Sequence, residues 1–326
     1  MEIDVGLIAS RLWELWPLGL IGLWRWGTWL LKANLSARHV DVGIDLPIDQ
    51  IPNLKTAVAL TLKGEPVAHF RRVLEAIARE NVYELCVTFA PGEDENVTLL
   101  EEFASWHPEM VVKWEFIEGK KRPGLQRAIQ MVSENIDIIF EMDSDTIMGE
   151  GVVEGAKRAF TDARLGGVVF SQRVWNPTTW VEKQFDLMLA IRYEHEIPGQ
   201  AVGGKVSCLS GRCSAYRAEL LKKIAPGLTT EKWLGIAKTG GGEDKSLTTA
   251  VHDLGWRTGF VSNATVYTRA EKSLMTFFIQ RLRWGRNSWF DGLRQMFSRL
   301  WFWKTPILAF YIIDRFLSTF TVLLPK

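Results

Sequence analysis

Two aspartates separated by one serine follow directly after an apolar stretch of the chain. Asp143 and Asp145 come after the segment Ile136 to Met142, whose composition predicts a buried β-strand. Two carboxylates on the turn that ends a strand can share one hard divalent cation through their oxygen atoms. Such a cation neutralises the charge that develops on a departing diphosphate. A solvated acidic turn is the alternative, but the position after a buried strand favours a metal site.

A second acidic pair follows three consecutive glycines. Glu243 and Asp244 come after Gly240 to Gly242 and open a predicted helix that ends near Gly255. Glycines let a ligand approach the backbone closely, and acidic residues suit the N-terminus of a helix. Ordinary helix-start chemistry is therefore one interpretation. The other is that either acid removes the proton from an acceptor hydroxyl.

Basic and aromatic residues are combined near position 280. Gln280, Arg281, Arg283 and Trp284 belong to the sequence QRLRW, at the end of a helix-like stretch. Arginine can bind a diphosphate through two hydrogen bonds, and an indole can stack on the face of a sugar ring. A basic helix anchored by tryptophan on a membrane surface is the alternative, and the two interpretations are compatible.

Two further basic segments are candidates for anion or sugar contacts. Lys120 to Arg122 precede a predicted helix that starts at Leu125, so a phosphate could lie before its N-terminus. A solvated basic turn is the alternative. Arg212 and Arg217 flank a turn at Gly211 that could approach a sugar, and a purely structural turn is equally compatible with the sequence.

The elements that must position these residues alternate along the chain from Lys55 to about Arg173. Strands separated by helices indicate right-handed crossovers and a mostly parallel α/β sheet. In such a sheet, ligands bind beyond the carboxyl ends of the strands. The predicted strands are Thr56–Leu62, Tyr83–Phe89, Val111–Ile117 and Ile136–Met142, with another starting at Gly167–Phe170, and the predicted helices are Pro66–Arg79, Val97–Trp106 and Leu125–Ser133.

The N-terminal region has the composition of a membrane-associated segment. The stretch from Leu12 to Leu31 has spanning length, but Glu14 and Arg25 interrupt it, and the uncharged run between them is too short to cross a bilayer alone. A spanning, re-entrant or interfacial segment remains open. We find no signal-peptide pattern, so we expect the mature protein to retain it. Lys32 and Arg38 follow, which predicts that the next region lies in the cytoplasm.

The C-terminal region also suggests membrane contact. Apolar residues recur at helical spacing from Trp289 to Trp301, which predicts a helix lying in the membrane interface. A surface helix packed on the domain is the alternative. The stretch Ile307 to Leu324 is long enough to span, although Asp314 and Arg315 lie in its middle. Because adjacent helix positions do not face each other, these two side chains do not pair with each other.

Overall composition limits the other possibilities. The 326 residues carry a formal net charge of +1, so no general field attracts nucleic acid. The 15 tryptophans are concentrated towards both ends, which is typical of contact with lipid headgroups. The three cysteines have no zinc-ligand spacing, and we expect reduced thiols in the core.

The order of four motifs resembles the family-2 glycosyltransferases of the GT-A fold. The motifs are DSDT, SG-x-C-x-x-YR, GGGED and QRLRW, and the resemblance extends from about Thr56 to Trp301. It is nearest to membrane hyaluronan synthases, with chitin and cellulose synthases as relatives. It implies a GT-A domain at residues 41–284, flanked by a membrane-associated segment at 1–40, an interface helix at 285–303 and a C-terminal transmembrane segment at 304–326.

The resemblance also implies roles for individual residues. Asp244 matches the catalytic base, with Glu243 beside it, and Asp145 matches the ligand of a Mg²⁺ or Mn²⁺ ion. Trp284 and Gly211 match the acceptor site, with the indole as its floor. The positions that match donor or nucleotide contacts are Asp143, Lys121, Arg122, Asp94, Thr61, Glu65, Arg283 and Gln280.

The sequence departs from the synthase pattern at several points. The acidic pair that usually follows the second strand is represented by the segment FAPGEDEN, in which Glu93 or Asp94 is the match. The segment after the first strand reads TLKGEP, and Arg212 stands where proline is common. Synthases carry several membrane helices after the Q-x-x-R-W motif, whereas about one follows here. We therefore expect that this chain does not build a polymer channel alone.

The resemblance implies an inverting β-glycosyltransferase that transfers a sugar from a UDP-sugar to a growing glycan at the cytosolic membrane face. Its expected partners are the donor, a glycan or lipid acceptor and membrane lipids, with self-association left open and no nucleic acid. One alternative is transfer of a single sugar to a membrane lipid, as ceramide glucosyltransferases do. Another is a truncated synthase subunit without catalytic activity.

Overall fold

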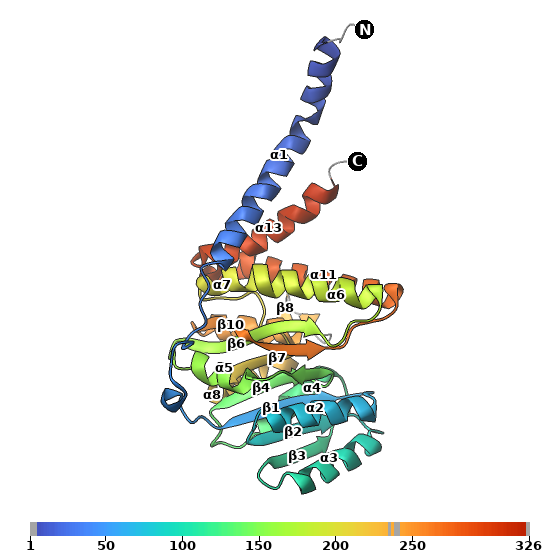
Figure 1. Ribbon diagram of the computed structural model, residues 1–326, viewed down its shortest axis with the longest axis vertical. Coiled ribbons are helices and arrows are strands. Elements are labelled where there is room, and N and C mark those ends of the chain that lie inside the picture. Colours follow the sequence, from blue (N-terminus) through green and yellow to red (C-terminus); the bar gives the residue numbers. More distant parts are fainter. Residues whose placement is uncertain (1–4, 234–235, 238–241, 324–326) are drawn as a thin grey trace.

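The computed structural model describes residues 5–233, 236–237 and 242–323, and the side chains of residues 19–232 and 242–319. Predictions for Gly240, Gly241, the first four residues and the last three residues therefore lie outside the described residues. A three-layer α/β domain is built on an eight-stranded sheet in the order β3-β2-β1-β4-β7-β6-β10-β5 (Figure 1). The strands are β1 (Thr56–Leu62), β2 (Glu84–Phe89), β3 (Val111–Phe116), β4 (Ile138–Asp143), β5 (Thr146–Met148), β6 (Leu165–Val174), β7 (Cys213–Arg217) and β10 (Arg257–Thr268).

The first half of the sheet confirms the alternating pattern of the sequence. β1 pairs in parallel with both β2 and β4, and β2 pairs in parallel with β3. The bounds of β1 agree with the prediction, and those of β2 to β4 differ by one or two residues. The sheet as a whole is mixed, however, so the expectation of a mostly parallel sheet is wrong for its second half. There β7 runs antiparallel to β4 and β6, and β5 runs antiparallel to β10, while β6 and β10 are parallel.

Helices cover both faces of this sheet, and the remaining elements connect them or leave the domain. The helices before β7 are α1 (Val5–Ser36), α2 (Val67–Arg79), α3 (Asp94–Trp106), α4 (Lys121–Met131), α5 (Val152–Ala159), α6 (Trp180–Ala190), a π-helical segment at Ile191–Glu196 and α7 (Ile197–Val202). After β7 come α8 (Ala218–Ile224), α9 (Gly227–Thr230), α10 (Glu243–Asp253), α11 (Leu274–Ser298), α12 (Leu300–Trp303) and α13 (Pro306–Leu323). A short 3₁₀ turn at Ile48–Gln50 precedes the sheet, and β8 (Lys232–Trp233) and β9 (Ile236–Ala237) form a separate hairpin.

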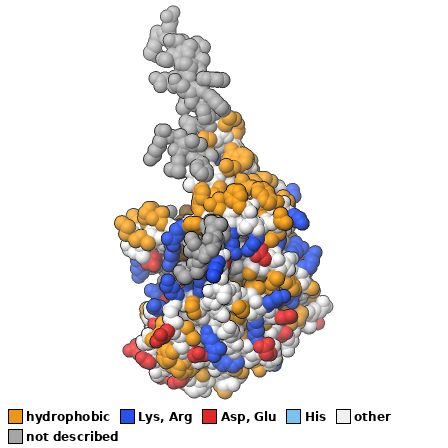
Figure 2. All heavy atoms as spheres, turned by 180° about the vertical axis from the view of Figure 1, so that it is seen from behind, with side chains coloured by type: hydrophobic (Ala, Val, Ile, Leu, Met, Phe, Trp, Pro, Cys, Tyr) orange, Lys and Arg blue, Asp and Glu red, His pale blue; other side chains and the backbone are white. Residues whose placement is uncertain are grey.

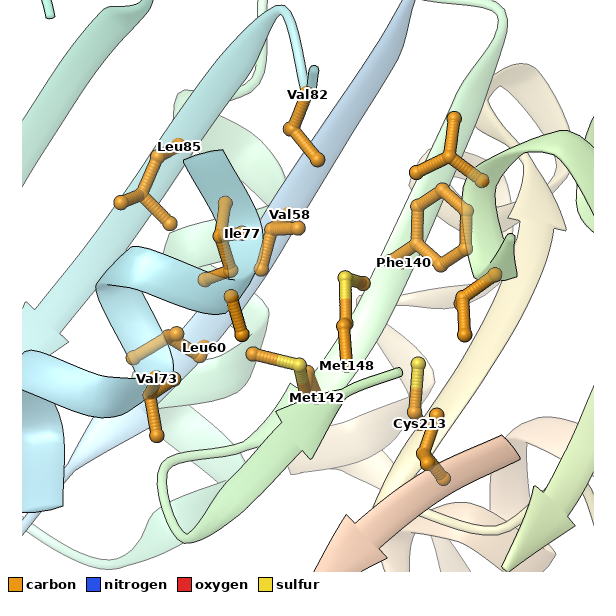
Figure 3. Packing of buried hydrophobic residues seen from close by; sticks show 14 of the residues in the cluster. Val58, Leu60, Val73, Ile77, Val82, Leu85, Phe140, Met142, Met148 and Cys213 are labelled. Carbon is orange, nitrogen blue, oxygen red and sulfur yellow. The ribbon is translucent and has the colours of Figure 1, made fainter. Parts of the chain in front are cut away.

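Successive side chains of the central strands point to opposite faces of the sheet, so the hydrophobic core has one part on each face. Val58 and Leu60 of β1 pack against Val73 and Ile77 of α2 on one face (Figure 3). The intervening Ala57 and Ala59 belong to the core on the opposite face, together with Leu125 and Ile129 of α4. Because both faces are covered, β1 is almost continuously apolar, as central parallel strands usually are. The three cysteines are free and buried, as expected.

The N-terminus of α6, a helix that lines the candidate site, is fixed by a capping box. Thr179 Oγ1 accepts a hydrogen bond from the backbone N–H of Glu182, and the Glu182 carboxylate accepts one from the backbone N–H of Thr179 at 2.7 Å. These bonds to backbone and side-chain donors of Thr178 and Thr179 lower the pKa of Glu182 to about 2. The ionised carboxylate is therefore favoured in the folded protein.

Replacing Glu182 with alanine is expected to lower the free energy of unfolding by about 1 kcal/mol at neutral pH. The folded-state pKa lies below the ordinary value of 4.5, so this stabilisation is present above about pH 4.5 and is lost as the pH falls towards 2. Denaturant unfolding of both proteins should show a difference that narrows in acid. The exposed Glu101→Ala on α3 is the control. A difference that stays constant between neutral and acidic pH would contradict the account.

Two helices leave the domain side by side. α1 and α13 project from the same end of the molecule (Figure 1), where Lys32 Nζ of α1 donates to Asp314 Oδ2 at 2.7 Å. The neighbouring Arg315 pairs instead with Glu196 at 3.4 Å, as expected for adjacent positions that do not face each other. Within the part of the chain that the structure describes, no helix is both long enough and apolar enough to span a bilayer.

The segment predicted as one interface helix, residues 285–303, is divided in the structure between the end of α11 and α12. α11 is continuous from Leu274 to Ser298, so the QRLRW sequence lies in its middle. Asp291 and Gln295 are each 4% exposed, whereas Phe297 and Leu300 are 85% and 83% exposed. α11 therefore packs Asp291 and Gln295 against the domain, whereas Phe297 of α11 and Leu300 of α12 are exposed. Hydrophobic side chains gather at the base of the projecting helices in Figure 2.

Candidate active site

A cavity of about 840 Å³ lies beyond the carboxyl ends of the parallel strands, where sheets of this kind bind ligands. Asp143 ends β4, and Asp145 lies on the short turn between β4 and β5. The cavity brings together most of the side chains that the sequence singled out. Those that line it are Lys121, Arg122, Asp143, Asp145, Gly211, Glu243, Asp244, Gln280, Arg283 and Trp284.

Lys121 is the centre of the acidic part of this cavity. Its ammonium group donates to the carboxylates of both Asp143 and Glu243, which joins the DSDT turn to the start of α10. Although burial opposes ionisation, these carboxylates raise the pKa of Lys121 well above its ordinary value, so it stays charged. α4 begins at Lys121, so Lys121 and Arg122 are in its first turn and do not precede it, as the sequence prediction placed them. The N-terminus was predicted too late because the basic residues gave no helical pattern.

Asp145 has no such cation partner among the described residues. Its carboxylate lines the cavity, and no described side chain or backbone group hydrogen-bonds to that carboxylate. Burial and the charge of Glu65 raise the pKa of Asp145, and burial raises the pKa of Asp143 to about 6. Glu65 itself pairs with Arg269 at 3.0 Å. Within the described ranges, no group of three or more His, Cys, Asp or Glu side chains is arranged to hold a metal ion.

Asp244 is held in a fixed orientation at the start of α10. Gly242 adopts a left-handed conformation with φ of 85° just before the helix, which requires glycine. The Asp244 Oδ1 atom accepts from the backbone N–H of Lys245 at 2.8 Å, and the Cys208 thiol donates to Oδ2 at 3.2 Å. A Cβ on Gly211 would lie 3.7 Å from Asp244 Cβ and 3.5 Å from Lys121 Nζ, so this glycine leaves space next to both.

Replacing Cys208 with alanine is expected to lower kcat by about three- to tenfold, because the Asp244 carboxylate loses one of its two donors. Cys208→Ser keeps a hydroxyl donor at the same place and should retain most of the activity. Steady-state kinetics of both variants, with thermal unfolding as a check on folding, measure the difference. Equal activity in the alanine and serine variants would show that the thiol does not position Asp244.

Glu141 is a residue of the site that the sequence analysis missed. It lies on β4, two residues before Asp143, is 1% exposed, and accepts from the Tyr216 hydroxyl at 3.1 Å. Burial and the surrounding carboxylates raise the pKa of Glu141 to about 8, against the opposing charge of Lys121. A charged residue inside the apolar run IDIIFEM was the available signal. The protonated carboxyl limits the negative charge behind Lys121.

Arg122 occupies a different place from Lys121. It is buried, and its guanidinium donates to the carbonyl oxygen atoms of Leu228 and Gly242, to Ser246 Oγ at 2.7 Å and to Glu231 at 3.1 Å. These bonds connect α4 to the segment before α10. The predicted role of Arg122 as a donor contact stays a prediction, and the visible contacts are structural.

The QRLRW residues form another wall of the cavity. Trp284 packs on Phe185 with ring centroids 5.7 Å apart, and the guanidinium of Arg212 lies 5.0 Å from the Trp284 ring. Arg283 is exposed at the cavity, and the buried Gln280 Oε1 has no hydrogen-bond partner among the described residues. The indole and the unpaired amide oxygen are thus available to a ligand.

The remaining predicted donor contacts lie outside the cavity lining. Thr61, at the end of β1, packs near Gly124 of α4, and Asp94 is exposed at the start of α3. The carboxylate of Glu93 accepts from Asn96 Nδ2 at 2.8 Å and from the backbone of Gly64. The roles of Thr61, Glu65 and Asp94 therefore stay predictions, and the structure does not bring them together with Asp244.

Comparison with protein families and curated proteins identifies similar chains. The model of the family described as "Glycosyltransferase like family 2" matches residues 56–287. The N-acetylglucosaminyltransferase of Rhizobium leguminosarum bv. viciae is 27% identical over 175 residues, which are 53% of this chain and 41% of that protein. Hyaluronan synthase 3 of Homo sapiens is 26% identical over 201 residues, 61% of this chain and 35% of that protein. The chain thus spans less than half the length of these two relatives.

Solved structures share the arrangement of the sheet and helices. A mannosyltransferase from Pyrobaculum calidifontis, PcManGT, solved with GDP-Man and Mn²⁺, has a TM-score of 0.62 at 17% identity, covering 90% of this chain and 79% of that one. Residues 1–349 of S. aureus TarS, solved with UDP-GlcNAc, give a TM-score of 0.52 at 15% identity, covering 81% and 73%. At these identities the likeness establishes the fold alone.

Proposed function

The chain belongs to glycosyltransferase family 2 and has a GT-A-like fold, and from this premise we propose that it is an inverting, UDP-sugar-dependent β-glycosyltransferase. The acceptor is a growing glycan at the cytosolic face of a membrane. The observation that carries this proposal is the meeting of the DSDT turn, Lys121, Asp244 and Trp284 in one cavity. The UDP-GlcNAc bound in the TarS structure supports a UDP-linked donor.

The residues of the cavity suit a single displacement. The sugar ring of the acceptor stacks on Trp284, and its hydroxyl oxygen attacks the anomeric carbon of the donor. The Asp244 carboxylate takes the hydroxyl proton, and the bond from the anomeric carbon to the diphosphate oxygen breaks, so UDP leaves with the electron pair. The side-chain N–H groups of Gln280 and the guanidinium of Arg283 donate to the donor diphosphate. Attack from the face opposite to the leaving group converts an α-linked donor into a β-linked product.

Asp145 fits a resident divalent cation, Mg²⁺ or Mn²⁺, because its half-buried carboxylate has no cation partner among the described residues and lies next to Asp143 and Glu65. Such a cation would neutralise charge on the diphosphate of the leaving group. The described side chains supply too few ligands to hold it alone. We therefore propose that the diphosphate oxygens of the donor complete its ligand set. The Mn²⁺ in complex with PcManGT supports this choice.

The configuration of the product tests the inverting mechanism. With an α-linked UDP-sugar and a short oligosaccharide acceptor, NMR coupling constants of the product are expected to show a β-linkage. An α-linked product would require a different mechanism. Product length separates a growing glycan from transfer of a single sugar to a lipid, since the first gives a ladder and the second gives one glycolipid.

We further propose that α11 and α12 lie in the membrane interface. Replacing Phe297 and Leu300 together by aspartate is expected to weaken binding to lipid vesicles by about tenfold or more, because each exposed apolar side chain contributes about 1.5–3 kcal/mol when it leaves water. Vesicle co-sedimentation measures the change. Trp106→Asp is the matched control, because Trp106 is 63% exposed on α3 at the opposite end of the domain (Figure 1). Unchanged binding of the double variant would contradict an interface helix.

A further inference from the structure

The cavity has a second cationic region beyond Asp244, apart from the DSDT turn. Arg192 of the π-helical segment, Lys245 of α10, Arg281 of α11 and Arg315 of α13 all line the same cavity. Four separate elements thus each place a positive charge in the part of the cavity beyond Asp244. Among the described acids that line the cavity, Glu196 is the one that forms an ion pair with a member of this group, namely Arg315 at 3.4 Å.

The four cations form one group. Burial lowers the pKa of Arg281, and the positive charges of Arg192, Arg212 and Arg315 lower it further. The pKa of Arg192 is raised despite burial, by Tyr193, Cys208 and Glu196. Burial and the charge of Arg315 lower the pKa of Lys245, and burial and the charge of Arg192 lower the pKa of Arg315 although Glu196 opposes this. Such mutual repulsion is unfavourable in the protein by itself, so an anion bound among the four would relieve it.

Arg192, Lys245 and Arg315 are separate from the cations that surround the donor end, and Arg281 lies near Trp284 between the two groups. The positive charges that act on Asp145 are those of Arg212, Lys121 and Arg269, whereas Arg192 and Lys245 act on Cys208. The Cys208 thiol contacts Asp244 Oδ2 at 3.2 Å. The candidate base therefore lies between the two cationic regions, and the second one is on the acceptor side.

An unpaired hydroxyl lies in the same region. Ser207 is 3% exposed, and its Oγ has no hydrogen-bond partner among the described residues. It lines a small hollow beside the main cavity together with Lys245, Ser288 and Arg315, which line both. A buried hydroxyl without a partner costs free energy unless a ligand or water bonds to it.

We infer that this region, here called the acceptor anion site and consisting of Arg192, Ser207, Lys245, Arg281 and Arg315, binds the phosphate or diphosphate of a lipid-linked saccharide. Four cations within one site match a multiply charged group better than a single carboxylate, for which one bidentate arginine suffices. The sugar then lies on Trp284 with its hydroxyl at Asp244. This inference rests on the proposed function and names its acceptor.

The surroundings of the site suit a lipid. Arg315 is on α13, which leaves the domain with α1 at the end where hydrophobic side chains gather (Figures 1 and 2). Next to Arg192, Ile191 is 52% exposed and lines the cavity, and Leu187 on α6 is 51% exposed. An alkyl chain attached to the bound phosphate could leave the cavity along these apolar side chains.

Binding to the purified full chain tests the inference without requiring turnover. The probes are decyl-diphosphate-linked N-acetylglucosamine and the decyl glycoside of the same sugar, titrated in detergent with UDP and Mn²⁺ present to occupy the donor end. The wild type is expected to bind the diphosphate probe at least about tenfold more tightly. Arg281→Gln and Arg192→Gln should each reduce this preference by about tenfold. Arg286→Gln is the matched control, because Arg286 is exposed on α11 and does not line the cavity.

Three results would overturn the acceptor anion site. These are equal binding of the two probes by the wild type, a preference that survives in both cavity variants, and a diphosphate probe that binds only when UDP is left out. Inorganic phosphate that competes at the concentration of the probe would assign the site to a free anion and not to a lipid-linked acceptor. UDP release by the wild type is measured separately. Release without a diphosphate preference refutes this inference alone, whereas a preference without release refutes the proposed function.

Discussion

Asp244→Asn is expected to lower the rate of sugar transfer at saturating substrates by about 10²–10⁴-fold, the range that a general base contributes. Asparagine has the size of aspartate and keeps one acceptor oxygen, which can bond to one of the two donors that orient Asp244, the backbone N–H of Lys245 or the Cys208 thiol. It cannot take a proton from the acceptor hydroxyl. The loss should therefore fall on kcat, and the KM for the donor should change little. Steady-state kinetics with a soluble acceptor measure both constants.

Glu243→Gln is the matched control for this variant. Glu243 is the neighbouring acid, but its carboxylate is bound to Lys121, whose charge lowers the pKa of Glu243 despite burial. Its replacement should loosen Lys121 and raise the KM for the donor more than it lowers kcat. If Asp244→Asn retained full transfer activity, or if the kcat loss occurred in Glu243→Gln instead, Asp244 would not be the base.

Asp145→Ala is expected to reduce transfer by about 10³-fold and to abolish its dependence on Mg²⁺ or Mn²⁺. The carboxylate of Asp145 is the group in the DSDT turn that Lys121 leaves free, and charge stabilisation by a divalent cation accounts for several kcal/mol of the barrier. A metal titration of the transfer rate, with isothermal calorimetry of donor binding, measures the effect.

The exposed Glu150→Ala, just beyond the same turn, controls for a general loss of acidic charge. It should leave the metal titration unchanged. A variant at Asp145 that is still activated by metal with the wild-type midpoint would place the cation elsewhere.

The first half of the sheet could be predicted from hydrophobic patterning alone. Strands buried on both faces, such as Thr56–Leu62, give continuous apolar runs that stand out between amphipathic helices. β7 could not be predicted, because the segment SGRCSAYR is polar and was interpreted as a turn. Its antiparallel pairing with β4 depends on Ser214 and Tyr216 meeting Glu141 and Ile139, which are distant in sequence.

Some residues of the candidate site could likewise be predicted from the sequence, and others could not. The rule that ligands bind at carboxyl ends of strands placed Asp143 and Asp145 correctly beside the cavity, and motif order added Asp244 and Trp284. The acceptor anion site gave no sequence signal, because its cations come from four elements that only the fold brings together. Cys208 was predicted as a core residue, and its contact with Asp244 depends equally on tertiary packing.

The most direct test of the proposed function is UDP release by detergent-purified protein, measured across a panel of UDP-sugars with and without Mn²⁺ or Mg²⁺, with GDP-mannose included as an alternative donor. We predict release from one UDP-sugar that depends on the metal and increases when an acceptor is added. No release from any donor, in protein shown to be folded by circular dichroism, would contradict the assignment as a glycosyltransferase and favour a chain without catalytic activity.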